Sequence, residues 1–234
     1  MNTLTVNGVN LTTSFGVVPT LTDTFEAAEP DIEYISVPGR SGDLVMSNDR
    51  FSNIEVTFPA FVYKNMKTNV KGLSAFLNSL KGYVRIEDSV HTEEFRLGQY
   101  AGGFKPSIGG QYEAAEFDIS FNCKPQRYLK SGETAQTFTA SGSINNPTLY
   151  ASKPLLTVVG SGSLIVGGVT ITIDTEQTDI TIDCETGDCY HGSTNCNGDV
   201  SFSSLDLPTI PAGTSTIGLD GVTSVSIVPR WFSI

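Results

Sequence analysis

The fold class is decided by the stretch Glu116–Cys123, which reads Glu-Phe-Asp-Ile-Ser-Phe-Asn-Cys. Every second residue in it is apolar, namely Phe117, Ile119, Phe121 and Cys123. Side chains alternate between the two faces of a β-strand, so this period of two predicts a strand with one buried face. Shorter apolar stripes of the same kind lie at Ile54, Val56 and Phe58 and at Phe95 and Leu97. We therefore expect an all-β protein.

The first strands of the chain are predicted at Leu4–Leu11, which carries Asn7-Gly8 at its centre. Both residues of an Asn-Gly pair tolerate positive φ, which the two central positions of a type I′ turn require. This segment predicts a tight β-hairpin.

One segment departs from the strand pattern. In residues 64–81 the apolar side chains recur at steps of four and three, at Met66, Val70, Leu73, Leu77 and Leu80. This spacing places them on one face of an amphipathic helix, and Gly82 is suited to end it. We expect a single helix that covers one face of a sheet.

The amino-acid composition changes between Arg127 and Pro154, where charged residues become rare. We therefore place a domain boundary near residue 132. Residues 1–132 form one expected β-sandwich domain, with the helix, and residues 133–234 form a second. The second sandwich is predicted from short apolar runs that are typical of strands, at Leu155–Val159, Leu164–Val166, Val169–Ile173, Ile180–Cys184, Val200–Phe202 and Val222–Val228.

The charge is acidic and unevenly distributed. The formal net charge is −11, and residues 131–234 hold two basic side chains, Lys153 and Arg230, against ten acidic ones. A nucleic-acid partner is therefore not expected, because phosphates are neutralised by basic patches. The N-terminus has no cationic and apolar signal sequence, and no apolar run reaches the roughly 18 residues of a membrane span. We expect synthesis and folding in a cytoplasm, without a membrane partner.

The cysteines give a weak metal signal. Cys184, Cys189 and Cys196 are spaced C-x4-C-x6-C near His191, whereas most structural zinc sites contain a C-x2-C pair. We expect reduced thiols that pack as small apolar residues, and no metal or other cofactor.

No catalytic motif is present. The two histidines, His91 and His191, fall in different expected domains, and neither a nucleophile elbow nor a phosphate-binding loop occurs. An acidic group near residue 185 could attract calcium but does not match an EF-hand loop; it comprises Asp179, Asp183, Glu185 and Asp188. A spatial pair of carboxylates for glycoside hydrolysis stays open. We expect no enzymatic activity.

A carbohydrate-binding module is the alternative function. Exposed aromatic side chains on a β-sandwich can stack on sugar rings, and the candidates in the second domain are Tyr150, Tyr190, Trp231 and Phe232. Adjacent residues of a strand face opposite sides, so we expect at least one of Trp231 and Phe232 in the core.

Residues 30–53 predict a long hairpin arm. Strand-like flanks surround the turn Pro38-Gly39-Arg40-Ser41-Gly42, and an open strand edge of this kind invites another chain. We expect the arm to hold an oligomer together, with contacts from Tyr34, Ile35, Val37, Leu44, Val45 and Met46.

Several motifs in order resemble the distal tail proteins of siphophages. In the first half they are the Pro38–Asp43 turn, the single helix, and Phe121–Tyr128 at the end of the domain. In the second half they are Asn146-Pro147-Thr148, Lys153–Leu156, Ile182–Gly187, Pro211–Thr214 and Pro229-Arg230-Trp231. The likeness spans almost the whole chain.

The resemblance implies a structural protein of the virion tail, assembled in the host cytoplasm. In that family the N-terminal domain builds a hexameric ring, and a galectin-like C-terminal sandwich lies outside it. The ring is a baseplate hub that joins the tail tube protein to the host-adhesion device. Its implied partners are further copies of the chain, the tail tube protein, a tail-associated lysin or fibre protein, and a receptor-binding protein.

Overall fold

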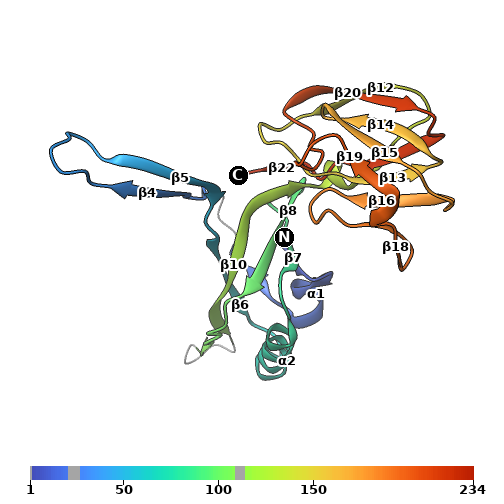
Figure 1. Cartoon of the computed structure of the whole chain (residues 1–234). Coiled ribbons are helices and arrows are strands. Elements are labelled where there is room, and N and C mark those ends of the chain that lie inside the picture. Colours follow the sequence, from blue (N-terminus) through green and yellow to red (C-terminus); the bar gives the residue numbers. More distant parts are fainter. Residues whose placement is uncertain (1, 21–26, 109–113) are drawn as a thin grey trace. The chain divides into compact units, whose positions relative to one another are not determined.

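The computed structural model describes residues 2–20, 27–108 and 114–234 (Figure 1). The chain divides into two compact units, an N-terminal unit of residues 1–127 with Ile234 and a C-terminal unit of residues 128–233. Strands dominate both units, so the all-β class is confirmed. Among the described residues, no helix is both long and apolar enough to cross a membrane.

The N-terminal unit is built on one antiparallel sheet. Its strands follow the spatial order β2 (Val9–Asn10), β1 (Leu4–Val6), β7 (Val84–Asp88), β8 (Glu94–Tyr100), β10 (Ala115–Leu129), β6 (Ile54–Val62) and β3 (Val18–Pro19), with β9 (Ser107–Ile108) beside the start of β10. The last two residues of β10 belong to the C-terminal unit. The alternation in Glu116–Cys123 is confirmed, since Phe117, Ile119, Phe121 and Cys123 are all buried.

The core of this unit lies between the inner face of the sheet and the helices. Helix α2 (Met66–Ser79) falls within the predicted segment and buries Leu73 and Leu77 completely. The helix ends before Gly82, which was expected to terminate it, because Leu80 is its C-cap and is already extended. Gly82 follows with φ at 65°. The predicted hairpin turn is also confirmed, because Asn7 and Gly8 both have positive φ between β1 and β2.

A second, short helix was not predicted. Helix α1 (Leu11–Phe15) begins where the strand pattern was expected to continue, because the side chain of Asn10 accepts hydrogen bonds from the backbone of Thr12 and Thr13. A capping bond of this kind favours the helix over continued pairing. The aromatic ring of Phe15 lies 5.6 Å from that of Phe76 on α2. A Cβ on Gly72 would come within 3.2 Å of Phe15, which explains the glycine inside α2.

The C-terminal unit is a sandwich of two antiparallel sheets. The first has the order β11 (Gln136–Phe138), β21 (Ser224–Val228), β13 (Leu155–Val159), β16 (Asp179–Asp183), β17 (Cys189–His191) and β18 (Thr194–Asn195). The second has the order β12 (Gly142–Asn146), β20 (Gly213–Asp220), β14 (Gly162–Val166), β15 (Val169–Ile173) and β19 (Val200–Phe202). Two 3₁₀ turns (Lys130–Glu133 and Asn197–Asp199) and β22 (Phe232–Ser233) complete the unit.

The core between these two sheets is aliphatic, with Ile, Leu and Val from both inner faces together with Trp231 and three cysteines. Such interdigitation of two inner faces is what holds a β-sandwich together. The sandwich expected for the second half of the chain is therefore confirmed.

Candidate assembly surface and polar sites

The predicted arm is a separate two-stranded sheet. Strands β4 (Pro30–Ile35) and β5 (Leu44–Phe51) pair with each other, as the blue hairpin of Figure 1 shows, and among the described residues neither pairs with a third strand. The loop between them carries Gly39 and Gly42 at φ of 80° and 84°, so glycine is required at both positions of the turn. Each strand therefore keeps one outer edge open.

The side chains of the arm are exposed although many are apolar. Tyr34 is 65% exposed, Val45 56% and Met46 50%, and Leu44 and Val37 are exposed as well. Ile35 is half-buried. The structure thus brings all six predicted contact residues together on one hairpin. Contiguous exposed apolar surface of this kind is typical of protein interaction sites.

The register shows that the apolar side chains occupy both faces of the arm. Directly paired residues share a face. The pair Tyr34 and Val45 lies on one face, which we call face A, and Ile32 and Ser47 lie on that face too. The other face, face B, carries Ile35 with Leu44 and Glu33 with Met46.

Ile32 was missed in the sequence, although its spacing of two from Tyr34 could have revealed it. A ribbon that is apolar on both faces cannot bury them against a single surface. Burial of both faces would therefore take two separate surfaces.

The arm is held together at its base by polar contacts. Arg50 donates a hydrogen bond from Nε to Asp31 at 2.5 Å, and this bond, with a further one from Asn48, keeps the pKa of Asp31 below its usual value. Ser52 donates its backbone N–H to Glu29 at 2.9 Å. The polar contacts fix the base of the hairpin, whereas most of the apolar side chains farther along it are exposed.

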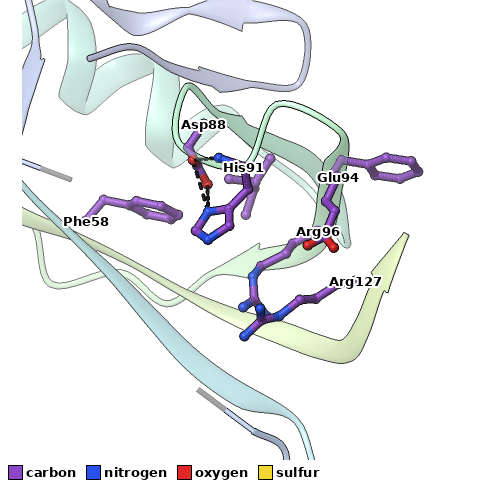
Figure 2. A pocket seen from close by; sticks show the side chains of 8 residues that line it. Phe58, Asp88, His91, Glu94, Arg96 and Arg127 are labelled. Carbon is purple, nitrogen blue, oxygen red and sulfur yellow. Dashed lines mark hydrogen bonds and ion pairs between the residues drawn. The ribbon is translucent and has the colours of Figure 1, made fainter. Parts of the chain in front are cut away.

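The first histidine lies in a small polar pocket of the N-terminal unit (Figure 2). Asp88 accepts hydrogen bonds from the backbone N–H groups of Val90 and His91, each at 2.8 Å, and its carboxylate lies 3.1 Å from Nδ1 of the same histidine. Figure 2 shows Arg96 and Arg127 on the other side of the pocket. The cavity has a volume of about 10 Å³, enough for one water molecule. This arrangement orders the loop after β7.

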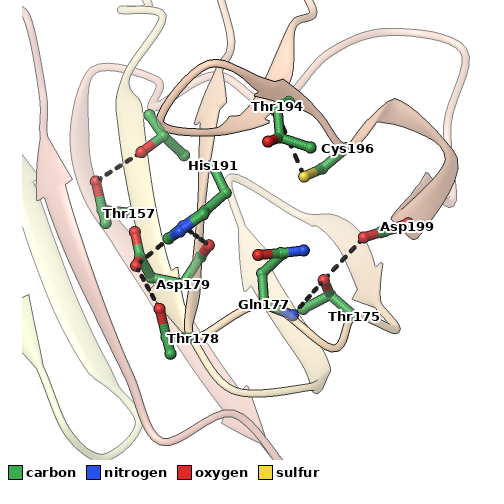
Figure 3. A network of polar contacts seen from close by, with 10 residues as sticks. Thr157, Thr175, Gln177, Thr178, Asp179, His191, Thr194, Cys196 and Asp199 are labelled. Atoms are coloured by element: carbon green, nitrogen blue, oxygen red, sulfur yellow. Dashed lines mark hydrogen bonds and ion pairs between the residues drawn. The ribbon is translucent and has the colours of Figure 1, made fainter.

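The second histidine lies in the C-terminal unit (Figure 3). Nδ1 of His191 lies 2.9 Å from the backbone carbonyl oxygen of Asp179 and 3.3 Å from its carboxylate. A separate contact joins Thr175 to Asp199 at 2.8 Å. The two histidines therefore belong to different units. His91 contacts a residue at the end of β7, whereas the contact of His191 joins the end of β17 to the start of β16.

The acidic group near residue 185 has a structural partner. Arg230 donates from two nitrogens to the carboxylate of Asp183, at 2.7 and 3.0 Å, and Glu185 lies at 3.8 Å. Arg230 keeps the pKa of Asp183 below its usual value, and the pKa of Arg230 is raised in turn. Within the described ranges, no three His, Cys, Asp or Glu side chains are grouped as metal ligands.

The aromatic side chains that were candidates for sugar stacking differ in burial. Trp231 is 3% exposed and belongs to the sandwich core, which confirms that one of the two terminal aromatics is buried. Phe232 is half-buried and stacks on Tyr150, with ring centroids 5.7 Å apart. Tyr190 is half-buried on β17. The largest candidate is therefore not available to a sugar.

No protein-family model and no curated protein sequence matches the chain. Several solved structures do match the fold of the chain. The chain superposes on the SPP1 Dit protein, described as a paradigm of the hub adsorption apparatus in phages infecting Gram-positive bacteria, with a TM-score of 0.75, 14% identity and 100% of both chains covered.

It also superposes on chains of the phage P2 baseplate in its activated conformation. With Ca the TM-score is 0.53 at 11% identity, covering 97% of both chains. With Sr it is 0.52 at 11% identity, covering 97% of this chain and 98% of the other. Over its full length, the chain therefore has the fold of phage Dit and baseplate proteins.

Proposed function

We propose that this protein is a distal tail protein, a structural hub of a phage baseplate. Six copies form a ring that joins the tail tube to the host-adhesion device. The full-length likeness to the SPP1 Dit protein carries this proposal, because the superposition covers 100% of both chains. The protein acts by assembly in the virion tail and not by catalysis, in agreement with its likeness to a phage hub protein.

Ring closure is assigned to the N-terminal domain, residues 1–132, and to its arm. In a closed ring each subunit offers one surface to a neighbour and a different surface to the other neighbour. The arm suits such a head-to-tail contact, because its exposed apolar side chains and open edges have no partner strand within the described residues of its own chain. Tyr34, Ile35, Val37, Leu44, Val45 and Met46 are the proposed contact residues.

The two faces of the arm suggest two kinds of contact. One face packs on the neighbouring subunit, and the other packs on a second surface, which in a tail belongs to the tail tube protein or to the lysin or fibre protein on the opposite side of the ring. The acidic C-terminal domain, with two basic side chains among residues 131–234, is left for a receptor-binding protein. We place assembly in the host cytoplasm.

Light scattering of the full chain at high protein concentration tests the ring. We expect about six times the 25.0 kDa mass of one chain. The double variant Ile35→Asp with Val37→Asp places two carboxylates in the interface, where unpaired charge is costly, and it should remain a folded monomer.

The control is Val159→Asp, a single valine-to-aspartate change at a 38%-exposed position of the C-terminal unit. This control should still form rings. A wild-type protein that stays monomeric, or a double variant that still assembles, would remove the arm from ring formation.

A further inference from the structure

Two cysteines lie directly opposite each other at the edge of the β11–β18 sheet. Strands β17 and β18 pair Tyr190 with Asn195 and His191 with Thr194. One step along this register, Cys189 meets Cys196, and the N–H of Cys196 donates to the carbonyl of Cys189 at 2.8 Å. The N–H of Cys189 donates instead to Oδ1 of Asn197, at 2.6 Å. Directly opposite residues of an antiparallel pair have Cα atoms about 4.5–5.5 Å apart, within the range that a disulfide bridges.

Both side chains also point to the same face. Cys189 is 2% exposed and Cys196 3%, and both belong to the core of the sandwich. Their neighbours Tyr190 and Asn195 point to the opposite face, as the alternation of a strand requires. The two thiols are therefore on one side of the hairpin and face a common space.

The third cysteine of the cluster, Cys184, does not lie directly opposite either of the other two. On β16 the residue opposite Cys189 is Ile182, so Cys184 is two residues away from that position. Diagonal neighbours across a sheet have Cα atoms about 7–8 Å apart, beyond the span of an unstrained disulfide. The register therefore selects one pair among three buried thiols.

Both thiols are free in the structure, as expected from the sequence. We propose that Cys189 and Cys196 form a disulfide that covalently closes the β17–β18 hairpin once the protein leaves a reducing compartment. The oxidant is a small disulfide such as oxidised glutathione. One cysteine thiolate attacks it and forms a mixed disulfide, and the second displaces the remaining glutathione. Two electrons and two protons thus pass to two glutathione thiols. The change of compartment rests on the proposed function, because a virion leaves the cytoplasm at lysis.

The reaction is slow under native conditions. Burial raises the pKa of Cys189 to about 11, and the neighbouring Asp188 and Cys196 add to the effect, so little thiolate is present at neutral pH. Reagent reaches the pair when β18, a strand of two residues at the sheet edge, opens locally. The thiols therefore survive synthesis and assembly and are oxidised afterwards.

Peptide mapping of the full-length protein tests the pairing. Cleavage before aspartate separates a peptide of residues 183–187, with Cys184, from a peptide of residues 188–198, with Cys189 and Cys196. After long incubation with oxidised glutathione, we expect the second peptide to lose the mass of two hydrogens and to resist alkylation. A bond to Cys184 would instead join the two peptides and would overturn the proposal, as would complete alkylation of both.

Two variants serve as controls. Cys196→Ser should abolish the mass loss, whereas Cys184→Ser, the matched change at the diagonal position, should leave it intact. Hydrogen exchange of the β17–β18 amides should slow after oxidation, and unchanged exchange would refute closure of the hairpin. Light scattering on the same samples reports ring formation separately, so failure of the disulfide and failure of the proposed function are distinguishable.

Discussion

Trp231 bears on both function hypotheses, because a buried tryptophan stabilises the sandwich and an exposed one could stack on sugar. With Trp231 in the core, Trp231→Ala should destabilise the C-terminal unit by about 3–5 kcal/mol. Denaturant unfolding measures this loss, and Phe232→Ala, at a half-buried neighbour, is the control with the smaller effect. Unchanged stability together with loss of binding on a glycan array would support the carbohydrate-binding alternative.

The pair of Asp183 and Arg230 makes the stability of the C-terminal unit sensitive to acid. The pKa of Asp183 in the folded protein lies below the usual value of an aspartate, mainly because of its hydrogen bonds to Arg230. A depressed carboxyl pKa contributes stability that is present above the unfolded value and is lost as the pH falls through the folded value. The pair should therefore lose its contribution below pH 3.8.

Denaturant unfolding of the wild type and of Asp183→Asn between about pH 2 and pH 6 measures this contribution. We expect the variant to be less stable at the upper end and the two proteins to converge as the pH falls, because the other carboxyls titrate in both. A constant difference in the free energy of unfolding across the range would contradict the assignment.

At the scale of the element, one side chain caps the N-terminus of helix α1. The side chain of Asn10 accepts from Thr12 and Thr13 at 3.0 and 3.1 Å. Asn10→Ala should destabilise the N-terminal unit by about 1 kcal/mol, whereas Asn10→Ser, which keeps a capping oxygen, should cost less. Chemical denaturation of the two variants makes the comparison, and equal losses would show that the cap does not stabilise α1.

Elements whose apolar residues recur at a regular spacing could be predicted from the sequence. Elements whose position depends on one side-chain contact could not. The stripe in residues 64–81 specified α2, and the alternation in Glu116–Cys123 specified most of β10. Helix α1 has five residues, too few for a period, and its start was set by the side chain of one asparagine. The arm was visible as a hairpin, but its two apolar faces depend on which residues of β4 and β5 pair.

At the scale of the whole molecule, we predict that residues 1–132 form the ring without the C-terminal sandwich. The arm and the sheet of the N-terminal unit lie within this segment. Light scattering of the isolated segment at high concentration should give about six times its own mass. A segment that is folded by circular dichroism but monomeric would assign part of the ring contact to the C-terminal unit.

The sequence alone determined the all-β class, the helix α2, the first hairpin turn and the acidic C-terminal half. These features follow from the spacing of apolar residues along the chain and from composition, so neighbouring residues suffice to specify them. The absence of nucleophile-elbow and phosphate-loop motifs was also readable without coordinates.

Only the tertiary structure decided which distant residues meet. It placed Trp231 in the core, paired Asp183 with Arg230, set Cys189 against Cys196, and gave the arm two apolar faces. The tight approach of Gly132 to the backbone of Trp231, where a Cβ would meet the nitrogen at 2.3 Å, is of the same kind. The physical reason is that register and packing depend on contacts between segments far apart in the chain, which no local pattern encodes.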